Sequence, residues 1–135
     1  MDFLEALKEK VLIFDGAMGT SIHKYDLTID DYLGYENCPE ILVESQPHVL
    51  QEIHASFLKV GCDVVETDSF GGSPIVLAEF GLADRAYELN KKAAELARGV
   101  AESYSQSGQR RFVSGSIGQT TKCHCNSFLK LKKYA

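Results

Sequence analysis

Tryptophan is absent from the 135-residue sequence, proline occurs only three times, and no apolar run approaches the ~20 residues of a membrane-spanning helix. Residues 1–16 intersperse charged with apolar positions, and their longest apolar run is too short for a secretory signal. These absences predict a soluble chain without a membrane partner, and we expect it in the cytoplasm.

Positive charge is also scarce. The 14 Lys and Arg residues against 19 Asp and Glu give a net charge of -5, and no basic stripe of the kind that binds nucleic acid is present. The basic cluster Lys130, Lys132 and Lys133 is expected to be a solvated tail. Four cysteines in such a chain are expected to be reduced thiols rather than a disulfide framework. Neither a GxGxxG nor a GxxxxGKS/T pattern occurs, which argues against a nucleotide phosphate loop.

The apolar periodicity that is present predicts helices alternating with buried strands. Pro47 suits the first turn of one helix and Gly61 suits its end. Ser73 and Pro74 are typical of a capped helix start, and Gly108 follows the longest helix. The predicted helices cover residues 2–10, 47–60, 74–81 and 83–104, the predicted strands cover residues 11–15, 63–68 and 112–116, and residues 26–40 form a loop.

Strands that alternate with helices indicate βαβ units with parallel strands and right-handed crossovers. The continuous apolar run at residues 11–14 predicts a strand that is buried on both faces. In all three strands, polar residues and glycines gather at the carboxyl end, where α/β proteins build their sites. The sequence therefore predicts an α/β protein whose three strands are parallel.

The stretch Asp-Gly-Ala-Met-Gly-Thr at residues 15–20 directly follows the first strand. Its carboxylate and its exposed backbone N–H groups together suit an amino acid, which carries both an ammonium and a carboxylate. The same residues also suit a glycine turn in which Asp15 caps the next helix. The spacing leaves both interpretations open.

The second strand ends in Glu-Thr-Asp-Ser-Phe-Gly-Gly at residues 66–72, which brings two hydroxyls and two acids to the same edge. These side chains could bind a ligand there. A helix start at Ser73 and Pro74 explains the stretch equally well without one.

Metal-ligating residue types are densest in the Cys-His-Cys group at residues 123–125. A structural zinc site needs a wider spacing between paired cysteines and a second pair elsewhere, whereas Cys38 and Cys62 stand alone. We therefore expect no metal site. His54 falls within the helix at residues 47–60 and is expected to be a surface or hydrogen-bonded histidine rather than a base.

Four segments follow one another with natural spacing. They are Leu-Ile-Phe-Asp-Gly-Ala-Met-Gly-Thr at 12–20, Asn-Cys-Pro-Glu-Ile-Leu at 37–42 followed by Gln-Pro at 46–47, Gly-Cys-Asp-Val-Val-Glu-Thr-Asp-Ser-Phe-Gly at 61–71, and Ser-Gly-Ser-Ile-Gly-Gln-Thr-Thr-Lys at 114–122. Together they resemble the homocysteine S-methyltransferase family over residues 3–122. Met18 and the Gly-Ser-Ile-Gly segment favour its cobalamin-dependent methionine synthase branch.

The resemblance implies a (β/α)8 TIM barrel, of which this chain would supply about three βα units, with their strands side by side in sequence order. It implies homocysteine bound to zinc as a thiolate and methylated from methylcobalamin, which methyltetrahydrofolate recharges. Asp15 would receive the homocysteine ammonium, and Thr67, with the backbone at Gly16 and Ala17 and with Ser69, would hold its carboxylate. The family's zinc ligands include an adjacent cysteine pair that this chain lacks, so neither zinc nor cobalamin is expected on it.

The similarity ends after Lys122. We therefore expect a partial homocysteine-binding domain at residues 1–122 and a divergent tail at residues 123–135. Members of the family continue with Ala-Ile after this point. The codons for Cys-His-Cys can encode Ala-Ile when the reading frame is shifted by one base, so a frameshift or a truncation would explain the tail.

The expected function is the homocysteine-binding part of a methyltransferase of the methionine synthase branch, inactive on its own. Its partners would be homocysteine and the remaining barrel, folate and cobalamin modules or a separate chain. One alternative is a non-catalytic α/β module that binds an amino acid or anion at its strand ends. Another is an unstable truncation product.

Overall fold

The computed structural model describes residues 2–106 and 109–120. Its elements are α1 (Phe3–Glu9), α2 (Met18–Ile22), η1 (Pro39–Ile41), α3 (Leu42–Ser45), α4 (Pro47–Lys59), β1 (Val64–Glu66), α5 (Pro74–Leu77), η2 (Ala78–Phe80), η3 (Ala83–Arg85), α6 (Ala86–Tyr104) and β2 (Phe112–Ser114). The predictions for the Cys-His-Cys group and the divergent tail at residues 123–135 lie outside the described residues.

Three segments run side by side and parallel, in the predicted order. β1 pairs with β2, with Val64 opposite Phe112. On the other edge of β1, Phe14 forms a parallel bridge with Val64, and the Asp15 N–H donates to the Val64 carbonyl over 2.9 Å. The predicted α/β class with parallel strands is therefore confirmed.

The first predicted strand is reduced to that single bridge. Val11 is 87% exposed and Ile13 61% exposed, so the prediction of a strand buried on both faces was wrong. The Ile13 N–H donates to the Asp63 side chain over 3.0 Å instead of to a neighbouring strand, and within the described ranges no further strand lies on the outer edge of this segment. β1 and β2 are also shorter than predicted, at three residues each.

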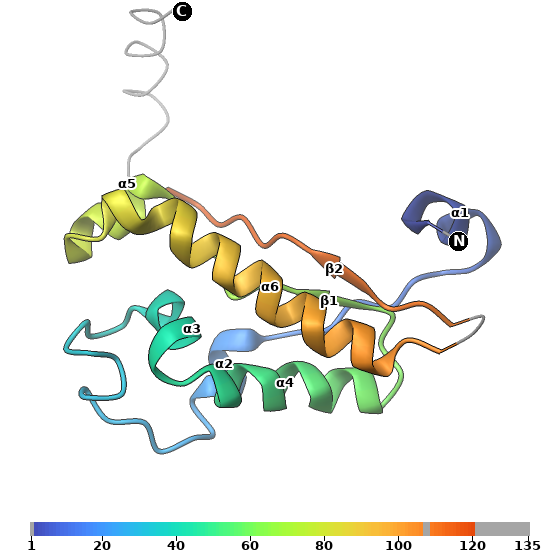
Figure 1. Ribbon diagram of the computed structural model, residues 1–135, viewed down its shortest axis with the longest axis horizontal. Helices are drawn as coiled ribbons and strands as arrows, with labels where there is room; N and C mark the ends of the chain where they lie inside the picture. The colour runs from blue at the N-terminus through green and yellow to red at the C-terminus, as the bar shows by residue number, and fades with distance from the viewer. Residues whose placement is uncertain (1, 107–108, 121–135) are drawn as a thin grey trace, which may run out of the picture.

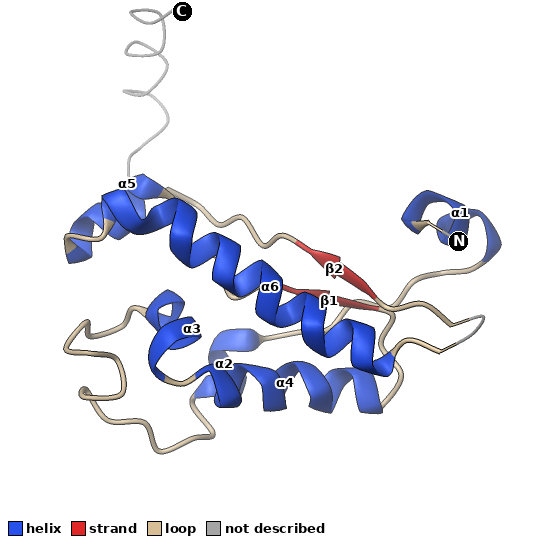
Figure 2. Ribbon diagram, in the orientation of Figure 1, coloured by secondary structure: helices blue, strands red, loops and turns tan. Residues whose placement is uncertain are grey.

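The long helices α4 and α6 pack against each other and lie along one face of the strands (Figure 1 and Figure 2). Their buried apolar residues recur at helical spacing, as predicted; they include Val49, Leu50, Ile53 and Leu58 on α4 and Leu89, Ala93, Ala97 and Ala101 on α6. The small side chains of Ala97 and Ala101 let α6 share one core cluster with Val65 of β1. This helical layer holds the short strands in place.

α1 packs at the amino end of the strands. A capping box starts it: the Asp2 side chain accepts from the Glu5 N–H over 2.8 Å, and the Glu5 carboxylate accepts from the Asp2 N–H over 2.7 Å. Phe3 meets Phe112 edge to face, with ring centroids 5.4 Å apart, and the buried Ala6 belongs to the same cluster.

A group of charged side chains fixes the start of β1. Asp63 accepts from the Lys10 ammonium over 2.6 Å and lies 3.5 Å from the Arg111 guanidinium, which also donates to the Cys62 carbonyl over 2.8 Å. Burial acts to raise the pKa of Asp63, but the hydrogen bonds from Lys10 and the Ile13 N–H outweigh it and lower that pKa.

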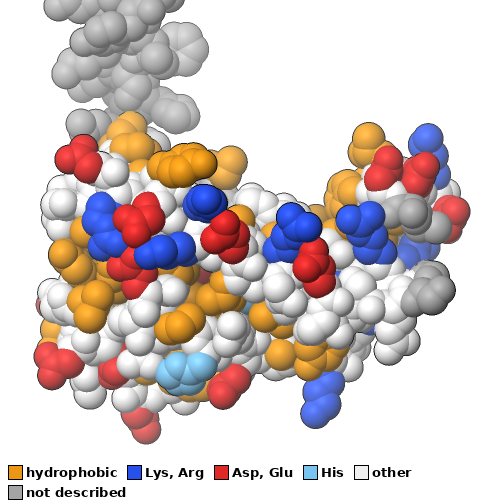
Figure 3. Space-filling view, in the orientation of Figure 1, with side chains coloured by type: hydrophobic (Ala, Val, Ile, Leu, Met, Phe, Trp, Pro, Cys, Tyr) orange, Lys and Arg blue, Asp and Glu red, His pale blue; other side chains and the backbone are white. Residues whose placement is uncertain are grey.

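Acidic and basic side chains alternate along the outer face of α6 (Figure 3). Glu88 pairs with Arg85 over 3.2 Å and with Lys92 over 2.8 Å, and Arg98 pairs with Glu102 over 2.7 Å. Such exposed pairs contribute little to stability and mark a solvated surface. In the described part of the chain, no helix has the length and apolar character to cross a membrane.

Candidate functional site

Polar residues meet at the carboxyl ends of the three parallel segments, and a cavity of about 320 Å³ lies among them. Four of the residues predicted from the sequence line it: Asp15, Gly16, Ala17 and Thr67. Ser69 joins them through a 2.6 Å hydrogen bond with Thr67. The fold thus brings together residues that are far apart in the sequence.

Asp15 is held against β1 rather than against a helix. Its Oδ1 accepts from the Glu66 N–H over 3.0 Å, and its Oδ2 lies 4.0 Å from His54 Nδ1. The N-cap of α2 is Ala17, without a side-chain hydrogen bond, so the alternative in which Asp15 caps the next helix was wrong.

The Asp15 carboxyl is nearly enclosed, with 5% of its side chain exposed. Burial raises the pKa of Asp15 to about 6; the hydrogen bond from the Glu66 N–H acts against this rise, and the Glu66 charge adds to it. A buried carboxylate with a raised pKa is stabilised when a cation binds beside it, and such groups are concentrated at functional sites. Asp15 therefore suits an ammonium.

The backbone after Asp15 is strained and open. Ala17 has φ 33° and ψ 64°, a left-handed conformation that costs a residue other than glycine about 1–3 kcal/mol. Within the described part of the chain, the N–H groups of Gly16 and Ala17 donate to no acceptor. These two donors border the cavity beside Asp15, where a ligand carboxylate could accept from them.

The hydroxyls of Thr67 and Ser69 connect the ends of β1 and β2. Ser69 Oγ donates to the Ser116 carbonyl over 2.9 Å, so the hydrogen between the two hydroxyls must come from Thr67. Thr67 Oγ1 in turn accepts from the Ser116 N–H over 3.1 Å. Both hydroxyl hydrogens are used within the protein, and a ligand carboxylate at Thr67 would compete with Ser69.

Two buried acids lie in the wall of the cavity: Glu40, which was not singled out from the sequence, and Asp68, one of the two acids noted at the end of the second strand. Glu40 accepts from the Gly71 N–H over 2.6 Å, and a Cβ on Gly71 would lie 2.6 Å from the same oxygen, so a larger residue there would have to displace the Glu40 carboxylate. Asp68 Oδ2 is buried without a hydrogen-bond partner in the described structure. Burial, and then the Glu40 charge, raise the pKa of Asp68 well above its usual value. Nothing in the sequence indicated that η1 would form within the predicted loop and bring Glu40 here.

His54 was predicted to be at the surface or hydrogen-bonded, and both predictions were wrong. Its side chain is 1% exposed, and neither ring nitrogen has a hydrogen-bond partner among the described residues. Burial lowers the pKa of His54 to about 4, so the ring is neutral at pH 7. Its spacing of four residues from both Leu50 and Leu58 was the signal that it faces the core.

The described cysteines do not fit the zinc that the resemblance implies. Cys38 and Cys62 are free and buried, and they belong to different core clusters. Burial, then the charge of Glu40 for Cys38 and of Asp15 for Cys62, raise the pKa of each thiol to about 11, whereas zinc binds thiolates. No group of three His, Cys, Asp or Glu side chains that could hold a metal occurs in the part of the chain that the structure describes.

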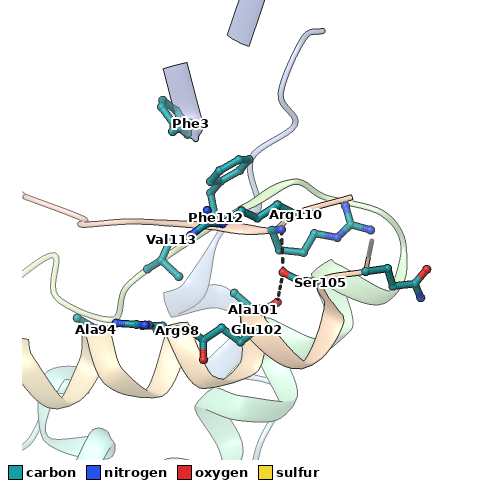
Figure 4. Close-up of a pocket in the computed structure, with 11 residues that line it drawn as sticks. Phe3, Ala94, Arg98, Ala101, Glu102, Ser105, Arg110, Phe112 and Val113 are labelled. Atoms are coloured by element: carbon teal, nitrogen blue, oxygen red, sulfur yellow. Dashed lines mark hydrogen bonds and ion pairs between the residues drawn. The ribbon is translucent and has the colours of Figure 1, made fainter. Parts of the chain in front are cut away.

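A larger cavity, of about 760 Å³, lies at the amino end of the strands (Figure 4). Its arginines already have partners: Arg98 pairs with Glu102, Arg111 donates to the backbone before β1, and the Arg110 guanidinium lies 6.0 Å from the Phe112 ring centroid. This cavity lies at the amino end of the strands, whereas α/β folds place their sites at the opposite end.

Comparisons with known proteins agree with this geometry. The sequence profile named homocysteine S-methyltransferase matches residues 12–134. Methionine synthase of Mycobacterium tuberculosis is 42% identical over 121 residues, which cover 90% of this chain and 10% of the relative. Methionine synthase of Mycobacterium leprae is 40% identical over 121 residues, which again cover 90% of this chain and 10% of the relative.

Solved structures give the same result. The oxidized form of the homocysteine methyltransferase MmuM from Escherichia coli has a TM-score of 0.69 at 30% identity, covering 87% of this chain and 41% of that one. The metallated form of MmuM has a TM-score of 0.69 at 25% identity, and the match covers 97% of this chain and 45% of that one.

A parallel α/β layer with an acid-lined cavity at the carboxyl ends of its strands places the chain among the α/β proteins, which build their sites at this end. Within that class, the chain belongs to the homocysteine S-methyltransferase family. It spans a tenth of the length of the mycobacterial methionine synthases that it matches and less than half of MmuM.

Proposed function

We propose that this chain is the homocysteine-binding part of a methionine synthase, and that Asp15, Gly16, Ala17, Thr67 and Ser69 hold the amino-acid end of homocysteine. The observation that carries the proposal is the buried Asp15 carboxyl, with its raised pKa, beside two backbone N–H groups that have no acceptor. The ammonium and carboxylate of one amino acid would satisfy both.

The roles of these groups follow from their charges. Ionised Asp15 accepts from the homocysteine ammonium, a charge-assisted hydrogen bond worth roughly 1.5–3 kcal/mol. The N–H groups of Gly16 and Ala17 donate to the homocysteine carboxylate. Thr67 contributes less, because its hydroxyl must leave Ser69 to donate to a ligand, and Ser69 acts through Thr67.

We further propose that the three parallel segments are the first strands of a (β/α)8 barrel. The exposed apolar side chains of Val11, Ile13 and Phe14 support this, because the remaining strands and helices of a barrel would cover both faces of this segment. The remaining barrel, and folate and cobalamin modules or a separate chain, would then complete the enzyme. Zinc and cobalamin belong to those parts in this proposal, and the chain alone transfers no methyl group. The free cysteines fit the reducing cytoplasm.

The proposal can be tested by titrating the isotope-labelled 135-residue chain with L-homocysteine and following backbone amide shifts by NMR. We expect binding no tighter than millimolar, with the largest shifts at residues 15–17 and 67. The matched control ligand is 4-mercaptobutyrate, which keeps the thiol and the carboxylate but lacks the ammonium, and it should bind at least tenfold more weakly. Equal binding of the control, or of a simple anion, would favour the alternative of a non-catalytic anion-binding module.

A further inference from the structure

His54 faces the ligand-binding carboxyl from the helical layer. It lies on α4, and its Nδ1 is 4.0 Å from Asp15 Oδ2, with 1% of the histidine side chain and 5% of the aspartate side chain exposed. His54 is not among the described residues that line the cavity. His54 therefore does not touch a ligand in this cavity directly, and Asp15 is the lining residue that it faces.

His54 has a ring N–H without an acceptor, and Asp15 has an oxygen that could accept from it. Both His54 nitrogens are buried without a hydrogen-bond partner in the described residues, and an unsatisfied buried polar group is unfavourable. Asp15 Oδ1 already accepts from the Glu66 N–H, whereas Oδ2 faces the imidazole. A closure of about 1 Å would bring the 4.0 Å separation into the range of a hydrogen bond.

We propose that neutral His54 is a positioning residue for Asp15: its Nδ1–H donates to Asp15 Oδ2 and, together with the Glu66 N–H on Oδ1, fixes the carboxylate in the orientation that receives an ammonium. The link to an ammonium rests on the proposed function, but the contact between His54 and Asp15 does not. Two donors on two oxygens leave lone pairs on both oxygens for the ligand.

The surrounding groups agree with a neutral donor. Burial holds the pKa of His54 at about 4, so at pH 7 the imidazole carries one N–H and no charge. The other titratable groups coupled to Asp15 are Glu66 on β1 and Cys62 just before it. Burial and the Asp15 charge raise the pKa of Cys62 to about 11, so this thiol does not compete as an anion.

The test uses NMR on the 135-residue chain without any ligand. Imidazole ¹⁵N shifts identify the tautomer of His54, and carboxyl ¹³C shifts give the pKa of Asp15. We expect the Nδ1–H tautomer at pH 7. In His54→Leu, which removes the donor, the pKa of Asp15 should rise by about one unit, the equivalent of one hydrogen bond to a charged group. In His54→Gln, whose amide can still donate, the rise should be smaller. His48→Leu, at an exposed position of the same helix, is the matched control and should leave that pKa unchanged.

An Nε2–H tautomer, a cationic ring at pH 7, or an unchanged Asp15 pKa in His54→Leu would overturn the assignment. If His54→Leu does not fold, the tautomer of the unsubstituted chain decides. Failure of the unsubstituted chain to bind L-homocysteine, with the expected tautomer and pKa shift present, would contradict the proposed function and support the His54–Asp15 contact.

Discussion

Replacing Asp15 by Asn should make the folded chain more stable at neutral pH. The carboxylate is ionised above pH 6 in a position that is almost closed to water, and folding therefore works against its charge. Asn removes the charge, and its side-chain oxygen can still accept from the Glu66 N–H that now donates to Asp15. A residue that serves a ligand at the expense of stability behaves in this way.

The magnitude follows from the pKa of Asp15, which rises from 3.8 to about 6. Because the folded state has the higher pKa, it binds the proton more tightly than the unfolded chain does. Below pH 3.8 the Asp15 carboxyl therefore does not destabilise the fold. Its destabilising effect grows between pH 3.8 and about 6, and it reaches its full size above about pH 6. At about 1.4 kcal/mol per unit, two units give an upper value of about 3 kcal/mol. We expect Asp15→Asn to gain about 1–3 kcal/mol at pH 7.5 and nothing near pH 3.5.

Urea unfolding of both chains at pH 7.5 and near pH 3.5 measures this difference. Asp63→Asn is the matched control, because it makes the same substitution beside the same strand: Asp63 directly precedes β1, whereas Asp15 accepts from the N–H of its last residue, Glu66. Asp63 is paired with Lys10 and accepts from the Ile13 N–H, so this variant should lose about 1.5–3 kcal/mol at pH 7.5. If Asp15→Asn is also destabilised at pH 7.5, the carboxylate serves the fold and the reasoning is refuted.

Three further predictions concern the same end of the strands. L-homocysteine should bind roughly tenfold more weakly for each pH unit below about 6, because protonated Asp15 cannot pair with an ammonium; NMR titrations at pH 5 and pH 7 measure this. Gly118→Ala should lose about 1–3 kcal/mol in urea unfolding, because its Cβ would lie 2.5 Å from the Phe70 carbonyl, whereas Gly99→Ala, in open space on α6, should gain about 0.5–1 kcal/mol. Thr67→Val should lose about 1 kcal/mol of stability and weaken homocysteine binding less than Asp15→Asn does, measured by unfolding and by ligand titration.

The parts of the fold that could be predicted were those with a strong local pattern. The apolar spacing of α4 and α6, the serine cap before Pro74 and the alternation of strands with helices all appear in the structure. Asp15 and Thr67 could be placed together because parallel strands end at one edge of a sheet. The first strand was over-predicted, because burial on both faces depends on neighbours that no local pattern reveals.

The parts of the site that were missed depend on tertiary contacts. Glu40 reaches the cavity from the short helix η1, which has no periodic signal in the sequence, and its carboxylate accepts from the Gly71 N–H. His54 was judged by its residue type, although its spacing within α4 placed it in the core. That a buried histidine would face a buried carboxyl follows from how α4 packs beside β1, which no pattern of residues encodes.

The central claim, that Asp15 receives the ammonium of homocysteine, is tested most directly in a complete enzyme. Residues 1–122 would replace the matching segment of Mycobacterium tuberculosis methionine synthase, with and without Asp15→Asn, and the homocysteine KM of each chimaera would be measured. Loss of one charge-assisted hydrogen bond predicts a KM about 10- to 100-fold higher in the variant, with folding retained. An unchanged homocysteine KM in a folded, active variant would contradict the account.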